Sequence, residues 1–165
     1  MKNTIIFLIA GLMGVFVACN KEDPVNPDPY ASLETDMLCK SGVELKGEGP
    51  DAGQSCVLWE YSEDSVLILK HLNAGFNCCP EKLFTDLAIK GDTIEITERD
   101  SLQLCRCNCL YDLEITIHYL KPQKYIIHMV EPFVVEPKEP LIFEIDLKNQ
   151  SSGKVCADRD YYPWG

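Results

Sequence analysis

The sequence lacks the short motifs by which the common enzyme classes are recognised. It contains no Gly-x-Ser-x-Gly elbow for a serine nucleophile, no His-Glu-x-x-His zinc motif, no glycine-rich phosphate loop and no Asp-rich calcium loop. The Cys-x-x-Cys spacing of thiol–disulfide enzymes and zinc fingers is absent as well. Adjacent acids such as Glu63-Asp64 are typical of solvated turns. We therefore expect no enzyme activity and no cofactor, and a role in binding or structure instead.

Basic residues and long apolar runs are also scarce. The 165 residues include 15 Lys and Arg against 26 Asp and Glu, which gives a formal net charge of -11. Such a chain repels phosphate backbones and anionic lipid, so we expect no nucleic acid partner. The longest apolar run, residues 5–17, is shorter than the about 20 residues that a membrane-spanning helix needs. After it, only residues 31–38 form a weak helix candidate, and there is no internal repeat.

The N-terminus has the organisation of a secretory signal. Lys2 precedes the apolar run, and the small residue Ala18 precedes Cys19. We expect residues 1–18 to be a signal peptide that is removed by cleavage before Cys19; an ordinary secreted protein with a cysteine at this position is the alternative. Prolines within residues 19–31 favour an extended tether. Residues 32–165 have a length that suits a single folded domain.

The remaining sequence alternates between apolar and polar residues with a period of two, which is typical of β-strands. Two alternating runs flank Gly91-Asp92 and predict a hairpin over residues 83–96. Further alternating runs occupy residues 110–120, 124–130 and 141–147, each with one apolar and one polar face. Many short strands with turn residues between them indicate an all-β antiparallel sandwich or barrel, of which we favour the β-sandwich.

The connection at residues 120–125 decides how two of these strands are arranged. Its Leu-x-Pro run before Tyr125 resembles the corner that precedes strand F in immunoglobulin-like and fibronectin-like β-sandwiches. A three-residue hairpin loop explains the residues equally well. In the hairpin, His118 and His128 would lie opposite each other, close enough to share a metal ion, although two exposed histidines are the simpler interpretation. For His71 we expect a hydrogen-bonded core or surface histidine.

Eight cysteines remain when Cys19 is set aside, and an even number in an exported chain favours disulfides over free thiols. Cys105, Cys107 and Cys109 share the parity of the apolar face of the following strand, which predicts that they face the core unless a bulge or loop start intervenes. Cys78 and Cys79 point to opposite faces of an extended chain, so we expect them to pair with two of this triplet. The third triplet cysteine, Cys39, Cys56 and Cys156 would then form the other two disulfides. The expected disulfide cysteines are Cys39, Cys56, Cys78, Cys79, Cys105, Cys107, Cys109 and Cys156.

A metal site and a redox-active pair at the clustered cysteines are the alternatives to structural disulfides. Same-face residues i and i+2 of a strand lie about 6.6–6.8 Å apart, whereas thiolates with zinc–sulfur bonds of about 2.3 Å lie about 3.8 Å apart. Extended chain therefore separates the triplet too far, and a shared ion requires the backbone to coil around it. The alternative function is a copper- or zinc-binding lipoprotein that uses Cys78, Cys79, Cys105, Cys107 and Cys109.

Several stretches together resemble one family. The signal ends in "FVAC", Lys21, Glu22 and Asp23 follow closely after Cys19, and the cysteine clusters read "FNCCP" and "CRCNCLYDLEI". These features resemble the small, cysteine-rich β-sandwich surface lipoproteins of Bacteroidota. The resemblance implies lipid on Cys19 and a surface-export signal at Lys21, Glu22 and Asp23. It places the protein in the outer membrane through its lipid anchor, exposed at the cell surface.

The same resemblance implies O-glycosylation of Asp-Ser/Thr-apolar tripeptides, which this chain has at Ser65, Thr93 and Ser101. All three tripeptides lie at predicted turns or strand starts, where a glycan is accommodated. The resulting expectation is a surface-anchored lipoprotein with a disulfide-stapled sandwich. It would act as a non-catalytic binding or accessory module for a glycan or a protein.

Overall fold

The computed structural model describes residues 27–40, 50, 53–101, 105–134 and 139–160. The signal peptide, Cys19 and the expected export signal at Lys21, Glu22 and Asp23 lie outside these residues. None of the described segments forms a helix that is long and apolar enough to cross a membrane. The strands within the described part of the chain are β1 (Tyr30–Glu34), β2 (Gln54–Ser62), β3 (Val66–Asn77), β4 (Leu83–Lys90), β5 (Thr93–Asp100), β6 (Asn108–His118), β7 (Lys124–Val130), β8 (Ile142–Asp146) and β9 (Ser152–Asp158).

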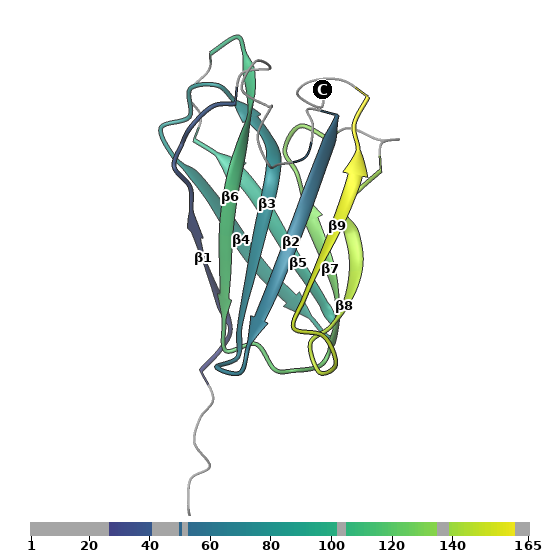
Figure 1. Cartoon of the computed structure of the whole chain (residues 1–165). Helices are drawn as coiled ribbons and strands as arrows, with labels where there is room; N and C mark the ends of the chain where they lie inside the picture. The colour runs from purple at the N-terminus through teal and green to yellow at the C-terminus, as the bar shows by residue number, and fades with distance from the viewer. Residues whose placement is uncertain (1–26, 41–49, 51–52, 102–104, 135–138, 161–165) are drawn as a thin grey trace, which may run out of the picture.

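The strands form two sheets that lie face to face (Figure 1). The five-stranded sheet has the order β1-β6-β3-β2-β9, and the four-stranded sheet has the order β4-β5-β7-β8. The turns that join β2 to β3, β4 to β5 and β8 to β9 lie at the end of the molecule where β1 begins. The two-sheet, all-β architecture agrees with the prediction from the sequence.

One strand pair departs from the antiparallel arrangement that the sequence predicts. β5 and β7 pair in parallel, with Ile96 opposite Met129. The chain leaves β5 for β6 in the other sheet and returns as β7. Because β6 runs back along the length of the sandwich, β7 has the same direction as β5 when it lies beside it. The other pairs are antiparallel, including the predicted β4–β5 hairpin, whose turn contains Gly91 with a φ of 66°.

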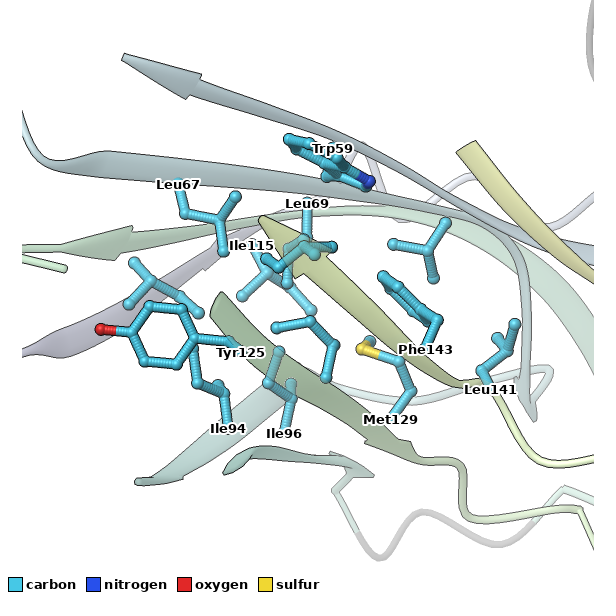
Figure 2. Close-up of a cluster of buried hydrophobic side chains, with 14 of the residues drawn as sticks. Trp59, Leu67, Leu69, Ile94, Ile96, Ile115, Tyr125, Met129, Leu141 and Phe143 are labelled. Atoms are coloured by element: carbon cyan, nitrogen blue, oxygen red, sulfur yellow. The ribbon is translucent and has the colours of Figure 1, made fainter. Parts of the chain in front are cut away.

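Alternate residues of the central strands point into the space between the sheets. In β6, Ile115 and Ile117 are fully buried, and in β5 the same holds for Ile94 and Ile96. Figure 2 shows side chains from both sheets packed against one another in this core. Full burial of one such side chain contributes about 1.5–3 kcal/mol. The contact between the two sheets is therefore the main stabilising interaction of the fold.

The chain between β6 and β7 crosses from one sheet to the other, so the hairpin alternative is wrong. Two tyrosines hold this crossing in place. The Tyr61 hydroxyl donates a hydrogen bond to the Leu120 carbonyl at 2.7 Å. Tyr125 is 4% exposed, and burial together with the nearby Tyr61 raises its pKa, against the opposing effect of a backbone hydrogen bond from Lys121. Tyr125 is thus buried at the start of the strand that follows the crossing.

The crossing also separates the two histidines that the hairpin would have brought together. His118 of β6 lies opposite Tyr30 of β1 and stacks on its ring, with 4.6 Å between the ring centroids. His128 of β7 lies beside Glu95 of β5, with 3.7 Å between its Nδ1 atom and the carboxylate. A metal site shared by the two histidines is therefore excluded by their placement in different sheets.

The weak helix candidate at residues 31–38 is wrong. β1 begins at Tyr30, two residues before the expected start of the folded domain, and pairs with β6. Ala31 and Leu33 pack against the core from this edge strand. Pairing with β6 and burial of these side chains outweigh the helix propensity of a short segment, which is marginal on its own.

A close contact between β2 and β9 gives a test of this packing. Gly153 lies opposite Trp59, and a Cβ atom on Gly153 would be 2.5 Å from the indole Nε1 atom. We predict that Gly153→Ala lowers the free energy of unfolding by about 1–3 kcal/mol, because the buried indole must shift. Chemical denaturation measures the change. Ser152→Ala, at the neighbouring exposed residue, is the control and should stay within about 0.5 kcal/mol of the wild type. Equal stabilities of the two variants would contradict the packing of Trp59.

Candidate functional site

Five polar residues are buried together between the sheets, and we call them the buried polar cluster. Ser55 of β2, His71 of β3 and Arg159 after β9 come from the five-stranded sheet and its C-terminal extension. Glu98 of β5 and Glu131 after β7 come from the opposite side. Each of the five is at most 9% exposed. The cluster therefore connects the two sheets through polar contacts between the main hydrophobic core and a smaller buried apolar cluster that includes Phe76, Leu83 and Tyr111.

Three members of the buried polar cluster have the hydrogen-bond order of a hydrolase triad. His71 lies between the other two, with its Nε2 atom 2.7 Å from Ser55 Oγ and its Nδ1 atom 2.6 Å from Glu98 Oε1. A catalytic serine must reach a substrate carbonyl and face an oxyanion site. Ser55 and His71 are both fully buried. This geometry therefore supports cross-linking of the sheets rather than attack on an external substrate.

The protonation of His71 follows from its neighbours. Burial lowers the pKa of His71, and the positive charge of Arg159 lowers it slightly further. The Glu98 carboxylate, helped by Glu131, raises the pKa by more than this, so the pKa of His71 lies above its usual value. Burial also raises the pKa of Glu98, against the effect of His71. The His71–Glu98 pair therefore retains its proton to a higher pH than an exposed histidine. A protonated imidazole donates from Nδ1 to Glu98 and from Nε2 to Ser55, which in turn donates to Glu131 at 3.3 Å.

Arg159 completes the charge balance of the cluster. Its Nη2 atom donates to Glu131 Oε2 at 2.6 Å, and its Nη1 atom donates to the Glu139 carbonyl at 2.5 Å. With His71 protonated, two cations face two carboxylates among side chains that are at most 2% exposed. Buried charges in proteins are tolerated when they are paired in this way.

Ser55, Glu98, Glu131 and Arg159 were not identified from the sequence as candidates. The sequence does carry a signal for Glu98, which continues the inward parity of Ile94 and Ile96. Ser55 likewise precedes Val57 and Trp59 on the inward parity of β2, and His71 follows Leu67 and Leu69 in β3. A polar residue at an inward-facing position of several strands is thus the sequence pattern that could have identified the cluster.

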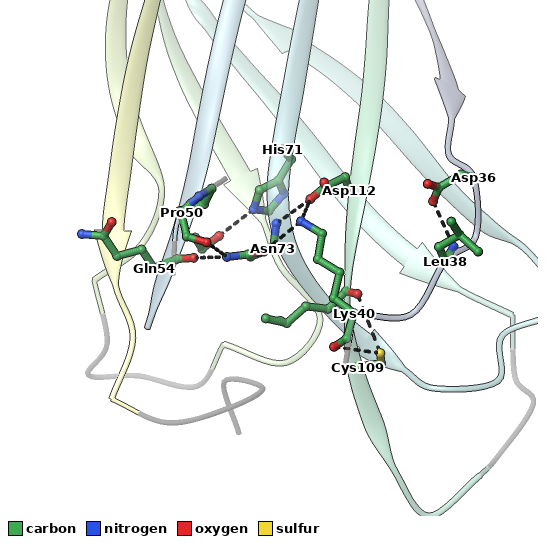
Figure 3. A network of polar contacts seen from close by, with 11 residues as sticks. Asp36, Leu38, Lys40, Pro50, Gln54, His71, Asn73, Cys109 and Asp112 are labelled. Carbon is green, nitrogen blue, oxygen red and sulfur yellow. Dashed lines mark hydrogen bonds and ion pairs between the residues drawn. The ribbon is translucent and has the colours of Figure 1, made fainter. Parts of the chain in front are cut away.

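A second polar network ties the segment after β1 to the five-stranded sheet (Figure 3). Asn73 has a left-handed φ of 62° at the register shift of β3. Its side-chain amide donates to the Gln54 carbonyl at 2.8 Å and accepts from Lys40 Nζ at 3.1 Å. Lys40 also pairs with Asp112, at 2.5 Å. This network fixes the backbone next to Cys39.

All eight expected cysteines form disulfides. The two adjacent cysteines pair with two members of the triplet, as the sequence predicts. The third member, Cys109, pairs with Cys39, and the last bond joins β2 to β9. The four disulfides are Cys39–Cys109, Cys56–Cys156, Cys78–Cys107 and Cys79–Cys105.

The predicted burial of the triplet is correct for one cysteine and wrong for two. Cys109 is fully buried, whereas Cys105 and Cys107 are exposed. The strand begins only at Asn108, so the parity argument does not extend to residues 105–107. These residues and residues 78–82, which connect β3 to β4, form what we call the distal loops, at the end of the sandwich opposite the start of β1 (Figure 1). Sulfur atoms of Cys78, Cys105 and Cys107 lie within 4.8 Å of one another there.

The three expected glycosylation residues differ in their surroundings. Ser65 lies in the β2–β3 turn with a left-handed φ of 63°, and Thr93 begins β5 after the Gly91 turn. Both are half-buried. Ser101 Oγ accepts hydrogen bonds from the backbone N–H groups of Glu81 and Lys82, at 2.8 and 3.1 Å. Ser101 therefore has a structural contact that a glycan on its oxygen would crowd.

Comparison with known proteins gives no relative: no family model matches the chain, and no curated protein or solved structure matches it.

The buried polar cluster predicts a pH dependence of stability. Because the folded-state pKa of His71 is raised, the native state binds this proton more tightly than the unfolded chain does. The contribution of this proton to the free energy of unfolding should therefore be fully present below about pH 6.5 and be lost as the pH rises through the folded-state pKa. We predict that His71→Gln lowers stability by roughly 3–5 kcal/mol at about pH 6, since it leaves Glu98 buried without its cation. Because burial raises the pKa of Glu98, this carboxyl keeps a slope of the same sign in that variant, and we expect His71→Gln/Glu98→Gln, which removes both groups, to lose the slope.

Chemical denaturation at a series of pH values measures both effects. His128→Gln is the matched control, because His128 is only half-buried in the four-stranded sheet, and it should keep the wild-type slope. An unchanged slope in His71→Gln/Glu98→Gln would show that other groups cause the pH dependence.

Proposed function

We propose that the protein is a surface-anchored lipoprotein whose β-sandwich serves as a non-catalytic binding or accessory module. In this proposal residues 1–18 are removed, Cys19 carries lipid, and Lys21, Glu22 and Asp23 direct the protein to the outer face of the outer membrane. The sequence of the first 23 residues is what supports the anchor and the location. The ligand is a glycan or a protein, and the acidic net charge of -11 makes nucleic acid a poor partner.

The observation that carries the proposal is that the start of β1 and the distal loops lie at opposite ends of the sandwich. β1 begins at one end, and the distal loops with their two disulfides lie at the other (Figure 1). Residues 19–27 span at most about 30 Å when fully extended. The 12 residues of β3 span about 40 Å. Lipid at Cys19 therefore holds the β1 end near the membrane, and the distal loops face outward.

The distal loops have the properties of a recognition surface. Cys105, Arg106, Cys107 and Asn108 are consecutive exposed residues, and disulfides fix this segment to the β3–β4 connection. Loops held by a rigid scaffold are frequent binding sites. A loop that is fixed before binding loses less conformational entropy when it meets its ligand. By contrast, the Ser55–His71–Glu98 arrangement lies in the interior, which supports a non-catalytic role.

We also propose an immunoglobulin-like or fibronectin-like relationship for the sandwich. The Tyr125 corner supports it, because strand F of those sandwiches follows a similar corner after a sheet crossing. The parallel β5–β7 pair is a departure, since both sheets of those sandwiches are antiparallel. The chain is therefore proposed as a variant with a rearranged four-stranded sheet.

Binding through the distal loops is tested with the full-length protein on arrays of glycans and of surface proteins. We predict retention of at least one ligand, which is recovered chemically unchanged. Arg106→Ala, in the exposed distal segment, should weaken its retention about tenfold, corresponding to about 1.4 kcal/mol. Lys148→Ala, in the exposed β8–β9 turn at the opposite end, is the control and should bind like the wild type. Release of a modified ligand, or equal loss in both variants, would contradict the proposal.

The anchor is tested by feeding cells a clickable fatty acid. We predict that Cys19→Ser abolishes labelling and releases the protein from the membrane fraction, because only the cysteine thiol accepts the first lipid. Asn20→Ser should label normally. Replacing Lys21, Glu22 and Asp23 together by alanine should leave labelling intact and protect the protein from protease added to whole cells. Labelling of Cys19→Ser at the wild-type level would rule out this anchor.

A further inference from the structure

Two neighbouring disulfides in the distal loops bring three cysteine sulfurs close together. Cys78 is bonded to Cys107, and Cys105 is bonded to Cys79. The Sγ atoms of Cys78, Cys105 and Cys107 lie within 4.8 Å of one another. Thiolates around one ion, with metal–sulfur bonds of about 2.3 Å, are about 3.8 Å apart. The Cys78 and Cys107 sulfurs are closer than this while they are bonded, so reduction would let them move apart to the spacing of a metal site. The Cys105 sulfur is at most about 1 Å too far from them for that spacing.

The geometric objection to a shared ion does not apply to these residues. Sulfurs at i and i+2 are separated too far only when the chain is an extended strand. β6 begins at Asn108, so Cys105 and Cys107 precede the strand. Cys109, which does lie in β6, is bonded to Cys39 and is fully buried. The candidate site therefore consists of three cysteines rather than the whole cluster of five.

Hydrogen bonds hold the distal loops together independently of the sulfur–sulfur bonds. The Cys78 N–H donates to the Cys107 carbonyl at 3.0 Å. The Asn77 side-chain amide donates to the Cys105 carbonyl at 2.7 Å, and its oxygen accepts from the Cys79 N–H at 3.1 Å. Asn77 is itself 8% exposed. The loops would therefore stay adjacent after reduction, which leaves the thiols preorganised for an ion.

Accessibility favours reduction of these two disulfides before the others. Cys105 and Cys107 are exposed, and Cys78 and Cys79 are half-buried. Each of the other two disulfides includes a fully buried cysteine, Cys56 or Cys109. Arg106 lies between the two exposed cysteines in the chain, and a neighbouring guanidinium stabilises thiolate.

We propose that reduction of Cys78–Cys107 and Cys79–Cys105 by a dithiol converts the distal loops into a three-thiolate site for a soft monovalent cation, Cu(I). Each disulfide takes two electrons and two protons from one dithiol, which closes to its own cyclic disulfide. Cu(I) then displaces the protons of Cys78, Cys105 and Cys107, and no electron moves in this step. Thiolate ligands select Cu(I), and three of them satisfy it, whereas structural zinc sites hold four ligands.

The experiment uses the full-length protein in detergent, treated anaerobically with a dithiol that is then removed. Cu(I) is titrated in competition with a coloured Cu(I) chelator, and the cysteines are mapped by alkylation and mass spectrometry with and without the metal. We expect about one ion per chain, no tight binding before reduction, and protection of Cys78, Cys105 and Cys107 from alkylation.

Two double variants make the result specific to the distal loops. Cys78→Ser/Cys107→Ser removes two ligands and should weaken Cu(I) binding at least about 100-fold. Cys56→Ser/Cys156→Ser removes the β2–β9 disulfide and should bind like the wild type. No tight binding after reduction, or equal weakening in both variants, would overturn the proposal. If the first variant does not fold, the alkylation map of the wild-type protein decides, and protection of Cys39, Cys56, Cys109 or Cys156 instead would overturn it.

This result is separable from the binding role proposed for the oxidised distal loops. Array binding of the untreated protein does not depend on Cu(I), so either proposal can fail while the other stands.

Discussion

Apolar side chains that alternate along the strands hold the two sheets against each other, and the other features of the molecule are placed relative to this contact. Ile94 and Ile96 of one sheet meet Ile115 and Ile117 of the other in a fully buried core. The period of two is what makes the contact continuous, since every second residue of each strand faces inward. A shift of one residue in any central strand would reverse its faces. The register of the sheets is therefore fixed by burial.

The buried polar cluster continues the same interface with a different chemistry. Beyond the main apolar core, the inward positions of β3 and β5 hold His71 and Glu98 instead of aliphatic side chains. Taking these groups out of water costs free energy, which the mutual pairing offsets only in part. Such pairing requires fixed partners, whereas an apolar contact tolerates sliding. The cluster thus adds a specific alignment of the two sheets.

Much of the fold was predictable because the strand signal is local. The hairpin around Gly91 and the alternation of β6 and β7 follow from neighbouring residues. The opposite directions of the adjacent Cys78 and Cys79 side chains likewise indicate that each bonds to a different cysteine. The errors have a common cause, which is that strand limits and strand partners are not local properties. Cys105 lies outside β6 because that strand begins only at Asn108, later than its parity suggests. Residues 31–34 pair with β6 instead of forming a helix. The parallel β5–β7 pair depends on where β6 is placed.

The sequence by itself determined the all-β class and the two faces of each strand, because the alternation of apolar and polar residues is visible within short segments. It also determined the use of the eight cysteines in disulfides, because their even number can be counted without knowing the fold. Only the tertiary structure decided which sheet receives each strand and which polar side chains meet. Ser55, His71 and Glu98 come from three strands in two sheets, and no spacing in the chain encodes their contact. Cys78 likewise lies close to Cys105 and Cys107 because the two distal loops lie at the same end of the sandwich, where packing of the sheets brings them together.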